Sequence, residues 1–302
     1  MIDIQNLTVQ FGGVKPIDGL TVMLEKPIVG LIGPNGAGKT TTLETIEGLL
    51  GPTSGRTMVP GFDTHREPER VKERIGVQLQ ASAYFDYLTL SEILGLFGQF
   101  YPKSIPTRVL LERVGLLDKA DTPVGKLSGG QKQRFTVAAA LVNDPEVVFL
   151  DEPTTGLDPQ ARRNVWDLTS EIHREGRTVI LTTHYMEEAQ SLCQRVAIID
   201  LGRIVALDTP SSLIHRLPTP YQLKVVLSGS VADGELEAIP GVQGVARQDG
   251  GTFSLGCADA ARTLASLQVW ASGRGLSLEY LEVVPATLED VFLGLTGKGL
   301  RD

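Results

Sequence analysis

The sequence predicts an α/β fold built around a phosphate-binding loop and followed by a small α+β unit. Three observations indicate this class. A glycine-rich loop lies between a short apolar run and a helix-like segment at residues 28–43. A second apolar run, at residues 147–150, ends in two adjacent carboxylates. Short strand-like runs alternate with helical patterns up to about residue 217, as expected for a parallel sheet covered by helices.

The glycine-rich loop reads GPNGAGKT and matches the pattern G-x-x-x-x-G-K-[ST]. Glycines allow a turn tight enough for successive N–H groups to face one anion, and the following helix adds its positive N-terminal end. Lys39 supplies a full charge for the outer phosphates, and the Thr40 hydroxyl is a hard oxygen ligand for Mg²⁺. A glycine turn without a ligand is the alternative, but the buried strand before the motif favours a phosphate site. That site comprises Gly33, Pro34, Asn35, Gly36, Ala37, Gly38, Lys39, Thr40 and Thr41.

Length and composition are those of an ordinary globular protein with about two domains. The chain has 302 residues, of which 42% are hydrophobic and 21% charged. Its 36 acidic residues exceed its 28 basic ones, which gives a net charge of −8. Because a nucleic-acid partner requires a clustered basic surface, we expect none.

The two cysteines, Cys193 and Cys257, lie far apart without metal-ligand spacing. We therefore expect reduced thiols rather than a disulfide or a zinc site. No apolar run approaches the roughly 18 residues that cross a bilayer, and the N-terminus has no basic-then-apolar signal segment. Any membrane-embedded part is thus expected in another chain.

The first predicted strand, Ile2–Phe11, alternates apolar and polar residues, and further strands are predicted at Leu20–Leu24 and Ile28–Ile32. Phe11 stands near the end of the first strand. It is either a core aromatic or a platform on which a nucleotide base stacks. Gln80 ends another predicted strand, at residues 74–80, where an isolated glutamine is typical of a solvated edge.

Residues 81–126 are predicted to form a small helical insert. The segment Thr89 to Glu92 has the T-x-x-E spacing of a capping box, and a second helix is expected between about 106 and 115. After the insert, a serine and two glycines precede a helical pattern at residues 135–143. Free N–H groups and a hydroxyl at a helix start can form an anion site, but this stretch taken alone favours a simple helix N-cap.

The apolar strand Val147–Leu150 delivers Asp151 and Glu152 to the carboxyl edge of the sheet. Adjacent carboxylates there are costly unless they serve a cation or a reactive water, and helix capping is the structural alternative. Asp151 suits the Mg²⁺ shell, and Glu152 suits a base that orients water. His184 follows the predicted strand at residues 178–183 on the same edge, where its imidazole could donate to a γ-phosphate.

We place a domain boundary between Leu217 and Pro218, in a stretch marked by prolines. Residues 218–302 have strand patterns at 221–227 and 276–284 and a helical pattern at 258–272. The TLED segment starting at Thr287 is expected to cap a last helix. No phosphate or metal signature occurs in this part. A regulatory or dimer-stabilising module is the preferred interpretation, and a merely stabilising appendix is the alternative.

Taken in order, these motifs resemble the ATP-binding subunit of ABC transporters. The resemblance covers residues 1 to about 215. The tail, with PATLEDVFLGLTG, is similar to the short C-terminal domain of the drug-exporter branch of bacterial ABC ATPases. The resemblance implies a P-loop NTPase-type ABC ATPase core with an antiparallel β subdomain and a helical subdomain, plus a small C-terminal α+β domain. The motifs are Phe11, the phosphate loop, Gln80, LSGGQ at 127–131, VVFLDEP at 147–153, GLD at 156–158 and His184.

The resemblance also implies ATP and Mg²⁺, with roles that carry over by position. Phe11 would stack on the adenine ring, although many relatives have tyrosine there. Lys39 would hold the β- and γ-phosphates. Thr40, Gln80 and Asp151 would attend Mg²⁺.

For catalysis, the resemblance implies that Glu152 polarises the attacking water and that His184 senses the γ-phosphate, with Gln80 and Lys39 completing the catalytic set. Two subunits would pack head to tail around two ATP molecules. In trans, Ser128 and Gly130 would bind the γ-phosphate, and Asp158 would couple the two sites. The nucleotide-facing residues of this second surface are Ser128, Gly129, Gly130, Gln131 and Asp158.

The implied function is ATP hydrolysis that drives a separate membrane permease. The exporter-like tail implies that transport is outward. The partner ATPase would be a second copy or a paralogous subunit, and the chain would lie on the cytoplasmic face of the membrane as a peripheral protein. A soluble ABC ATPase acting on ribosomes or DNA is the alternative. Such relatives usually carry two cassettes or a long coiled coil, whereas only 48 positions separate Gln80 from Ser128 here.

Overall fold

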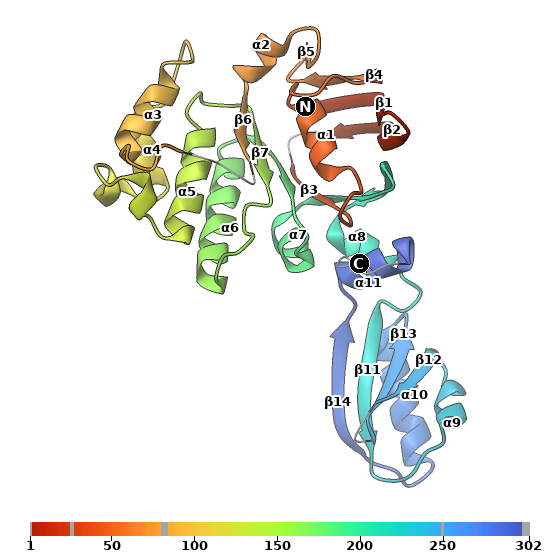
Figure 1. Cartoon of the computed structure of the whole chain (residues 1–302). Coiled ribbons are helices and arrows are strands. Elements are labelled where there is room, and N and C mark those ends of the chain that lie inside the picture. The colour runs from red at the N-terminus through yellow and green to blue at the C-terminus, as the bar shows by residue number, and fades with distance from the viewer. Residues whose placement is uncertain (1, 25–26, 80–83, 249–250, 298–302) are drawn as a thin grey trace. The chain divides into compact units, whose positions relative to one another are not determined.

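The computed structural model describes residues 2–24, 27–79, 84–248 and 251–297. The chain divides into two compact units between Thr209 and Pro210 (Figure 1). The predicted boundary, between 217 and 218, lies a few residues later. The division falls earlier because helix α8 (Pro210–His215) packs against helix α11 (Leu288–Thr296), so that both belong to the second unit. Gln80 lies outside the described residues.

A four-stranded antiparallel sheet contains the N-terminal strand. Along this strand, Ile4 and Leu7 both point into the core although three positions separate them. The irregularity in register between them, with Asn6 at φ +47°, lets the inward pattern resume after a bulge. The sheet has the order β2-β1-β4-β5, formed by β1 (Ile2–Phe11), β2 (Val14–Leu24), β4 (Ser54–Val59) and β5 (Phe62–Asp63).

A six-stranded sheet, mostly parallel, forms the centre of the first unit. Every residue of β3, β7 and β8, three of its four inner strands, is buried, which matches their largely apolar sequences. The carboxyl ends of these strands therefore meet at one edge, as predicted. The order is β10-β9-β3-β8-β7-β6, with β3 (Ile28–Ile32), β6 (Ile75–Gln78), β7 (Val147–Asp151), β8 (Thr178–Thr182), β9 (Arg195–Asp200) and β10 (Arg203–Asp208).

Helices follow most of these strands, and the first one is shorter than predicted. The sequence favours a helix from Thr40 to Leu50, but α1 ends at Ile46, with Glu47 as its C-cap. Gly48 takes a left-handed φ of +76°, and a Cβ there would lie 2.7 Å from the carbonyl oxygen of Thr64. The main helices are α1 (Lys39–Ile46), α2 (Pro68–Lys72), α5 (Gly129–Ala140), α6 (Pro159–Arg174) and α7 (Met186–Leu192).

The described part of the predicted helical insert, residues 84–126, contains helices and no named strand. Its first helix has the predicted capping box, since the Thr89 hydroxyl accepts from the backbone N–H of Glu92 and the Glu92 carboxylate accepts from that of Thr89. The insert packs on α5. Its elements are α3 (Leu90–Gly98), α4 (Thr107–Arg113) and two 3₁₀ turns, η1 (Leu117–Lys119) and η2 (Val124–Lys126).

The second unit is an antiparallel sheet of order β12-β13-β11-β14, with α10 packed along one face (Figure 1). It has its own apolar core, which includes Leu223, Leu255 and Leu267. The predicted capping box at Thr287 is also present. None of the described helices of the chain is sufficiently long and apolar to span a bilayer. The remaining elements are β11 (Tyr221–Leu227), α9 (Asp233–Glu237), β12 (Val242–Arg247), β13 (Phe253–Cys257), α10 (Ala260–Ser272) and β14 (Leu278–Pro285).

Candidate nucleotide-binding site

The phosphate loop connects β3 to α1 and has a backbone that only glycine allows at its critical positions. Gly38 has a φ of +103°, and a Cβ there would lie 2.0 Å from the carbonyl oxygen of Pro16. A Cβ at Gly33 would lie 2.3 Å from the carbonyl oxygen of Ile199. Both glycines are therefore fixed by close approach of neighbouring backbone. The loop is held rigidly at the edge of the sheet, as a cradle for an anion requires.

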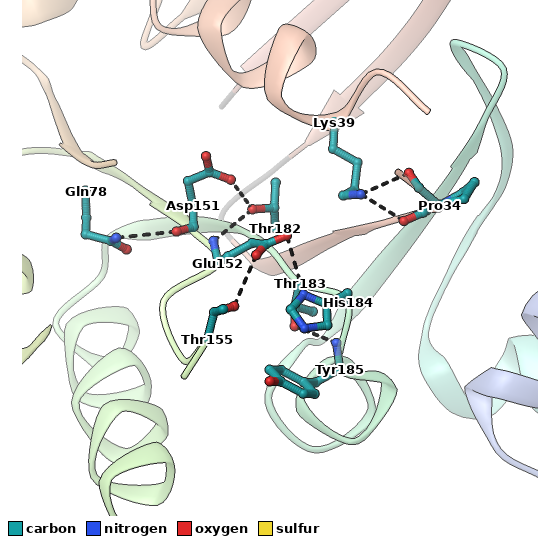
Figure 2. Close-up of polar contacts among 11 residues, drawn as sticks. Pro34, Lys39, Gln78, Asp151, Glu152, Thr155, Thr182, Thr183, His184 and Tyr185 are labelled. Atoms are coloured by element: carbon teal, nitrogen blue, oxygen red, sulfur yellow. Dashed lines mark hydrogen bonds and ion pairs between the residues drawn. The ribbon is translucent and has the colours of Figure 1, made fainter. Parts of the chain in front are cut away.

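Lys39 begins α1 and turns its side chain back towards this loop. Its Nζ donates to the carbonyl oxygens of Gly33, at 2.8 Å, and Pro34, at 3.1 Å (Figure 2). Burial lowers the pKa of Lys39, and the nearby carboxylates of Glu152 and Asp151 act in the opposite direction. Because neutral carbonyls are its hydrogen-bond partners, the ammonium retains charge for phosphate oxygens. The loop and its lysine thus fit a polyphosphate.

Asp151 is the last residue of β7 and is 9% exposed. Its carboxylate accepts a hydrogen bond from the Thr182 hydroxyl (Figure 2). Burial raises the pKa of Asp151, and the neighbouring Glu152 raises it further, while Thr182 and Lys39 lower it. A buried carboxylate beside a second acid is stabilised by a cation, and carboxylate oxygen is the ligand that Mg²⁺ prefers. The chemistry of Asp151, with the exposed Thr40 hydroxyl after the loop lysine, therefore fits a Mg²⁺ ion.

Gln78, the last residue of β6, was not predicted as a site residue. Its side-chain amide donates to the backbone carbonyl of Asp151 at 3.4 Å (Figure 2). The sequence VQLQ contains the signal that could have found it, because residues two apart on a strand share a face. Gln80 itself is not among the described residues.

Glu152 follows Asp151 with a left-handed φ of +46°, which is strained for a residue with a side chain. Its backbone N–H donates to the Thr182 hydroxyl at 2.9 Å, and its carboxylate accepts from the Thr155 hydroxyl at 3.1 Å. The other carboxylate oxygen lies 3.4 Å from Nδ1 of His184 (Figure 2). The strained turn thus brings a carboxylate and an imidazole together at the sheet edge, as the sequence predicted.

Phe11 lies at the end of β1, and 52% of it is exposed. This exposure excludes the core position that the sequence left open. Its role as a platform for adenine stays a prediction.

A second group of predicted residues surrounds a separate cavity of about 530 Å³. Ser128 caps α5 through a capping box, since its hydroxyl accepts from the N–H of Gln131 and its own N–H donates to the Gln131 side chain. Asp158 caps α6 by accepting from the N–H of Ala161 at 2.9 Å. The helix-cap interpretation of Ser128 is therefore correct, and Ser128 and Asp158 both line the hollow as well as capping their helices. The predicted residues on it are Ser128, Gly129, Gly130, Gln131 and Asp158.

These features define a P-loop nucleotide-binding protein: a mostly parallel sheet, a glycine loop with its lysine, and a carboxylate pair at the end of another strand of the sheet. A family model described as "ABC transporter" matches residues 20–155. The Nod factor export ATP-binding protein I of Burkholderia lata is 38% identical, with 100% of this chain and 98% of the relative covered. The linearmycin resistance ATP-binding protein LnrL of Bacillus subtilis is 34% identical, with 100% of each covered.

A solved structure, described as the ATP-binding subunit of an ABC transporter, is 27% identical with a TM-score of 0.64 and covers 70% of this chain and 91% of its own. The chain belongs to the family of ATP-binding subunits of ABC transporters, and it is an ATPase. The predicted family and fold class are thereby confirmed. These relatives give no support to the alternative of a soluble ATPase acting on ribosomes or DNA.

Proposed function

We propose that the chain powers an exporter, by driving a separate membrane permease through ATP-dependent head-to-tail dimerisation. The names of two full-length relatives, one for Nod factor export and one for linearmycin resistance, support outward transport. Their similarity extends over the whole chain and thus includes residues 210–297, beyond the ATPase unit. The chain would work at the cytoplasmic face of the membrane, held there by the permease.

The observation that carries this proposal is the presence of two incomplete sites in one chain. The phosphate loop with Lys39 and the hollow beside Ser128 have no residue in common. A helix N-terminus favours an anion, yet the Ser128 hollow contains no lysine, and Arg134 is the one basic residue among those that line it. If two subunits pack head to tail, the loop of one supplies the nucleotide to the hollow of the other. Asp158 then lies at the junction of the two sites.

Within each site, the residues of this chain divide the work. Lys39 and the loop bind and orient the phosphates, and closure of the second subunit excludes bulk water. Glu152 orients the attacking water and accepts its proton, while His184, held 3.4 Å away, contacts the γ-phosphate. Thr40, Gln80 and Asp151 would hold Mg²⁺, which supplies charge neutralisation at the phosphate oxygens. Phe11 is proposed to stack on adenine.

The permease is proposed to dock at a cavity of about 400 Å³ beside the helical insert. Leu49 and Leu79 line this cavity and are 61% and 48% exposed. Phe85 and Tyr87 nearby in sequence are 71% and 94% exposed. Leu49 and Leu79 are large, exposed apolar side chains at a concave surface, which favours a protein partner. The cavity lies against β6, whose end leads to Gln80, so nucleotide-dependent changes there could reach the partner.

The second unit, described over residues 210–297, is proposed to form an accessory module that regulates the ATPase or stabilises its dimer. The sheet and the apolar core of this module are its own, and its sequence carries no phosphate-loop motif. A role in chemistry is therefore not proposed for it.

Co-expression with a membrane protein whose gene is found beside this one tests the proposal. The two proteins should co-purify, and reconstitution should raise the ATPase rate above that of the isolated chain. Parallel sedimentation of the isolated chain with ribosomes serves as the control. Co-sedimentation with ribosomes, together with no binding to the membrane protein, would contradict the transport function.

A further inference from the structure

Glu47 is a buried acid that the nucleotide site does not use. It is the C-cap residue of α1, and its backbone N–H bonds to the carbonyl oxygen of Leu43. Only 3% of the residue is exposed, and it lines the cavity of about 400 Å³ beside the helical insert. Within the described parts of the chain, its side chain makes no hydrogen bond or ion pair. Buried polar side chains are normally paired, so this acid requires an explanation.

Several features of its surroundings disfavour a negative charge on Glu47. The C-terminal end of a helix is itself negative, which disfavours a carboxylate there. Burial raises the pKa of Glu47 to about 8, and the carboxylates of Asp151 and Glu44 contribute in the same direction. A glutamine of the same size would avoid this cost. The position of Glu47 therefore does not serve the stability of the isolated chain.

The walls of the cavity show what could compensate the acid. Val77, Tyr84 and Phe97 provide apolar and aromatic surface, with Leu49 and Leu79 at the more exposed part. Lys72 is the one basic residue among the described residues lining the cavity, and its Nζ is held by Glu69 at 2.8 Å. The cavity thus combines an apolar lining with an acid that lacks a cation. Its complement is an apolar segment that carries one basic side chain.

We propose that Glu47 receives a lysine or arginine side chain from the cytoplasmic segment of the permease that enters this cavity. This inference rests on the proposed transport function, which supplies the partner. The aliphatic stem of the basic side chain would pack along Tyr84 and Phe97, and its charged end would reach Glu47. A membrane protein without a basic residue at this point would leave the acid buried and unpaired. The ion pair would therefore contribute to specificity for one permease as well as to affinity.

The substitution Glu47→Gln tests the pair in the complex with the membrane permease that co-purifies with this chain. The matched control is Glu44→Gln, because Glu44 lies one turn earlier on α1 and does not line the cavity. We expect Glu47→Gln to raise the dissociation constant of the complex at least about tenfold. Glu44→Gln should change it less than about twofold. The ATPase rate of the isolated chain should stay unchanged in both. A second variant, Glu47→Met, should weaken binding as Glu47→Gln does.

Replacing each lysine and arginine in the cytoplasmic segments of the membrane protein by glutamine then identifies the partner residue. One replacement should reproduce the loss and add nothing in combination with Glu47→Gln, as a double-mutant cycle requires. The inference would be overturned if Glu47→Gln bound the membrane protein as tightly as wild type does. It would also be overturned if the effect of every basic replacement simply added to that of Glu47→Gln. Either result would leave the transport function standing. If the unmodified chain does not bind the membrane protein, both the inference and the proposed function fail.

Discussion

A carboxylate oxygen of Glu152 lies 3.4 Å from Nδ1 of His184, and this contact joins the ends of strands β7 and β8. The two residues are 32 positions apart in sequence and come from neighbouring parallel strands. Thr182 reinforces the junction, since its hydroxyl contacts both Asp151 and the backbone N–H of Glu152. The proposed base and the proposed phosphate sensor are therefore positioned by one shared sheet edge.

Glu152→Gln should retain ATP binding and lose turnover by at least about a hundredfold, because the amide cannot accept the proton of water. Without hydrolysis, the ATP-bound dimer should persist in size-exclusion chromatography with light scattering. Glu171→Gln, on the exposed face of α6, is the control and should behave as wild type. A purely monomeric Glu152→Gln variant in ATP would show that another residue is the base.

His184→Ala should lower kcat much more than it weakens nucleotide binding, since its proposed contact is with the γ-phosphate alone. Steady-state kinetics combined with equilibrium binding of ATP separate the two effects. His65→Ala is a suitable control, because His65 is exposed and lies outside the site. Equal losses in binding and turnover would assign His184 a general structural role.

Mixing two inactive variants tests whether each site needs residues of both subunits. Lys39→Ala removes the phosphate-binding ammonium, and Ser128→Arg blocks the opposing hollow. In a mixed dimer, one site combines the intact loop of the second variant with the intact Ser128 of the first. The mixture should therefore regain ATPase activity that neither variant shows alone. Continued inactivity of a mixture that does dimerise would argue against head-to-tail sites.

The pH dependence of stability should reveal the buried acid Glu47. Its pKa is raised from 4.5 to about 8, first by burial and then by Asp151 and Glu44. Since the folded state prefers the protonated form, the stabilising contribution is present below pH 4.5 and is lost as the pH rises through 8. At pH 9, Glu47→Gln should exceed wild type in unfolding free energy by on the order of 4 kcal/mol. Denaturant unfolding measures this, and a pH-independent difference would contradict it.

Truncation after Thr209 removes the second unit, which has a separate sheet and core. The remaining unit should still bind ATP, because its site residues all precede the cut. Dimer stability or the ATPase rate should change if the second unit is regulatory. Analytical ultracentrifugation and ATPase assays measure the two quantities. If neither they nor transport changes, the second unit is a stabilising appendix.

The centre of the fold was predictable because strands buried on both faces have continuous apolar sequences, as in VVFL before Asp151. The meeting of Lys39, Asp151, Glu152 and His184 followed from the shared edge of parallel strands. Strand β4 gives no such signal, since Ser54, Gly55 and Arg56 are exposed. Two further features depend on tertiary contacts that no local pattern records. These are the contact of Gln78 with the Asp151 backbone and the burial of Glu47.

At Glu152, the residue type that suits the left-handed backbone differs from the residue type that the proposed hydrolysis requires. Thermal stability and turnover therefore place opposite demands on this one position. Glycine adopts φ +46° without strain, so Glu152→Gly would relax the turn by on the order of 1 kcal/mol. The same change would delete the carboxylate beside His184. A directed-evolution screen that rewards only survival on heating would consequently drift towards glycine here and yield a sturdier protein that no longer cleaves its nucleotide.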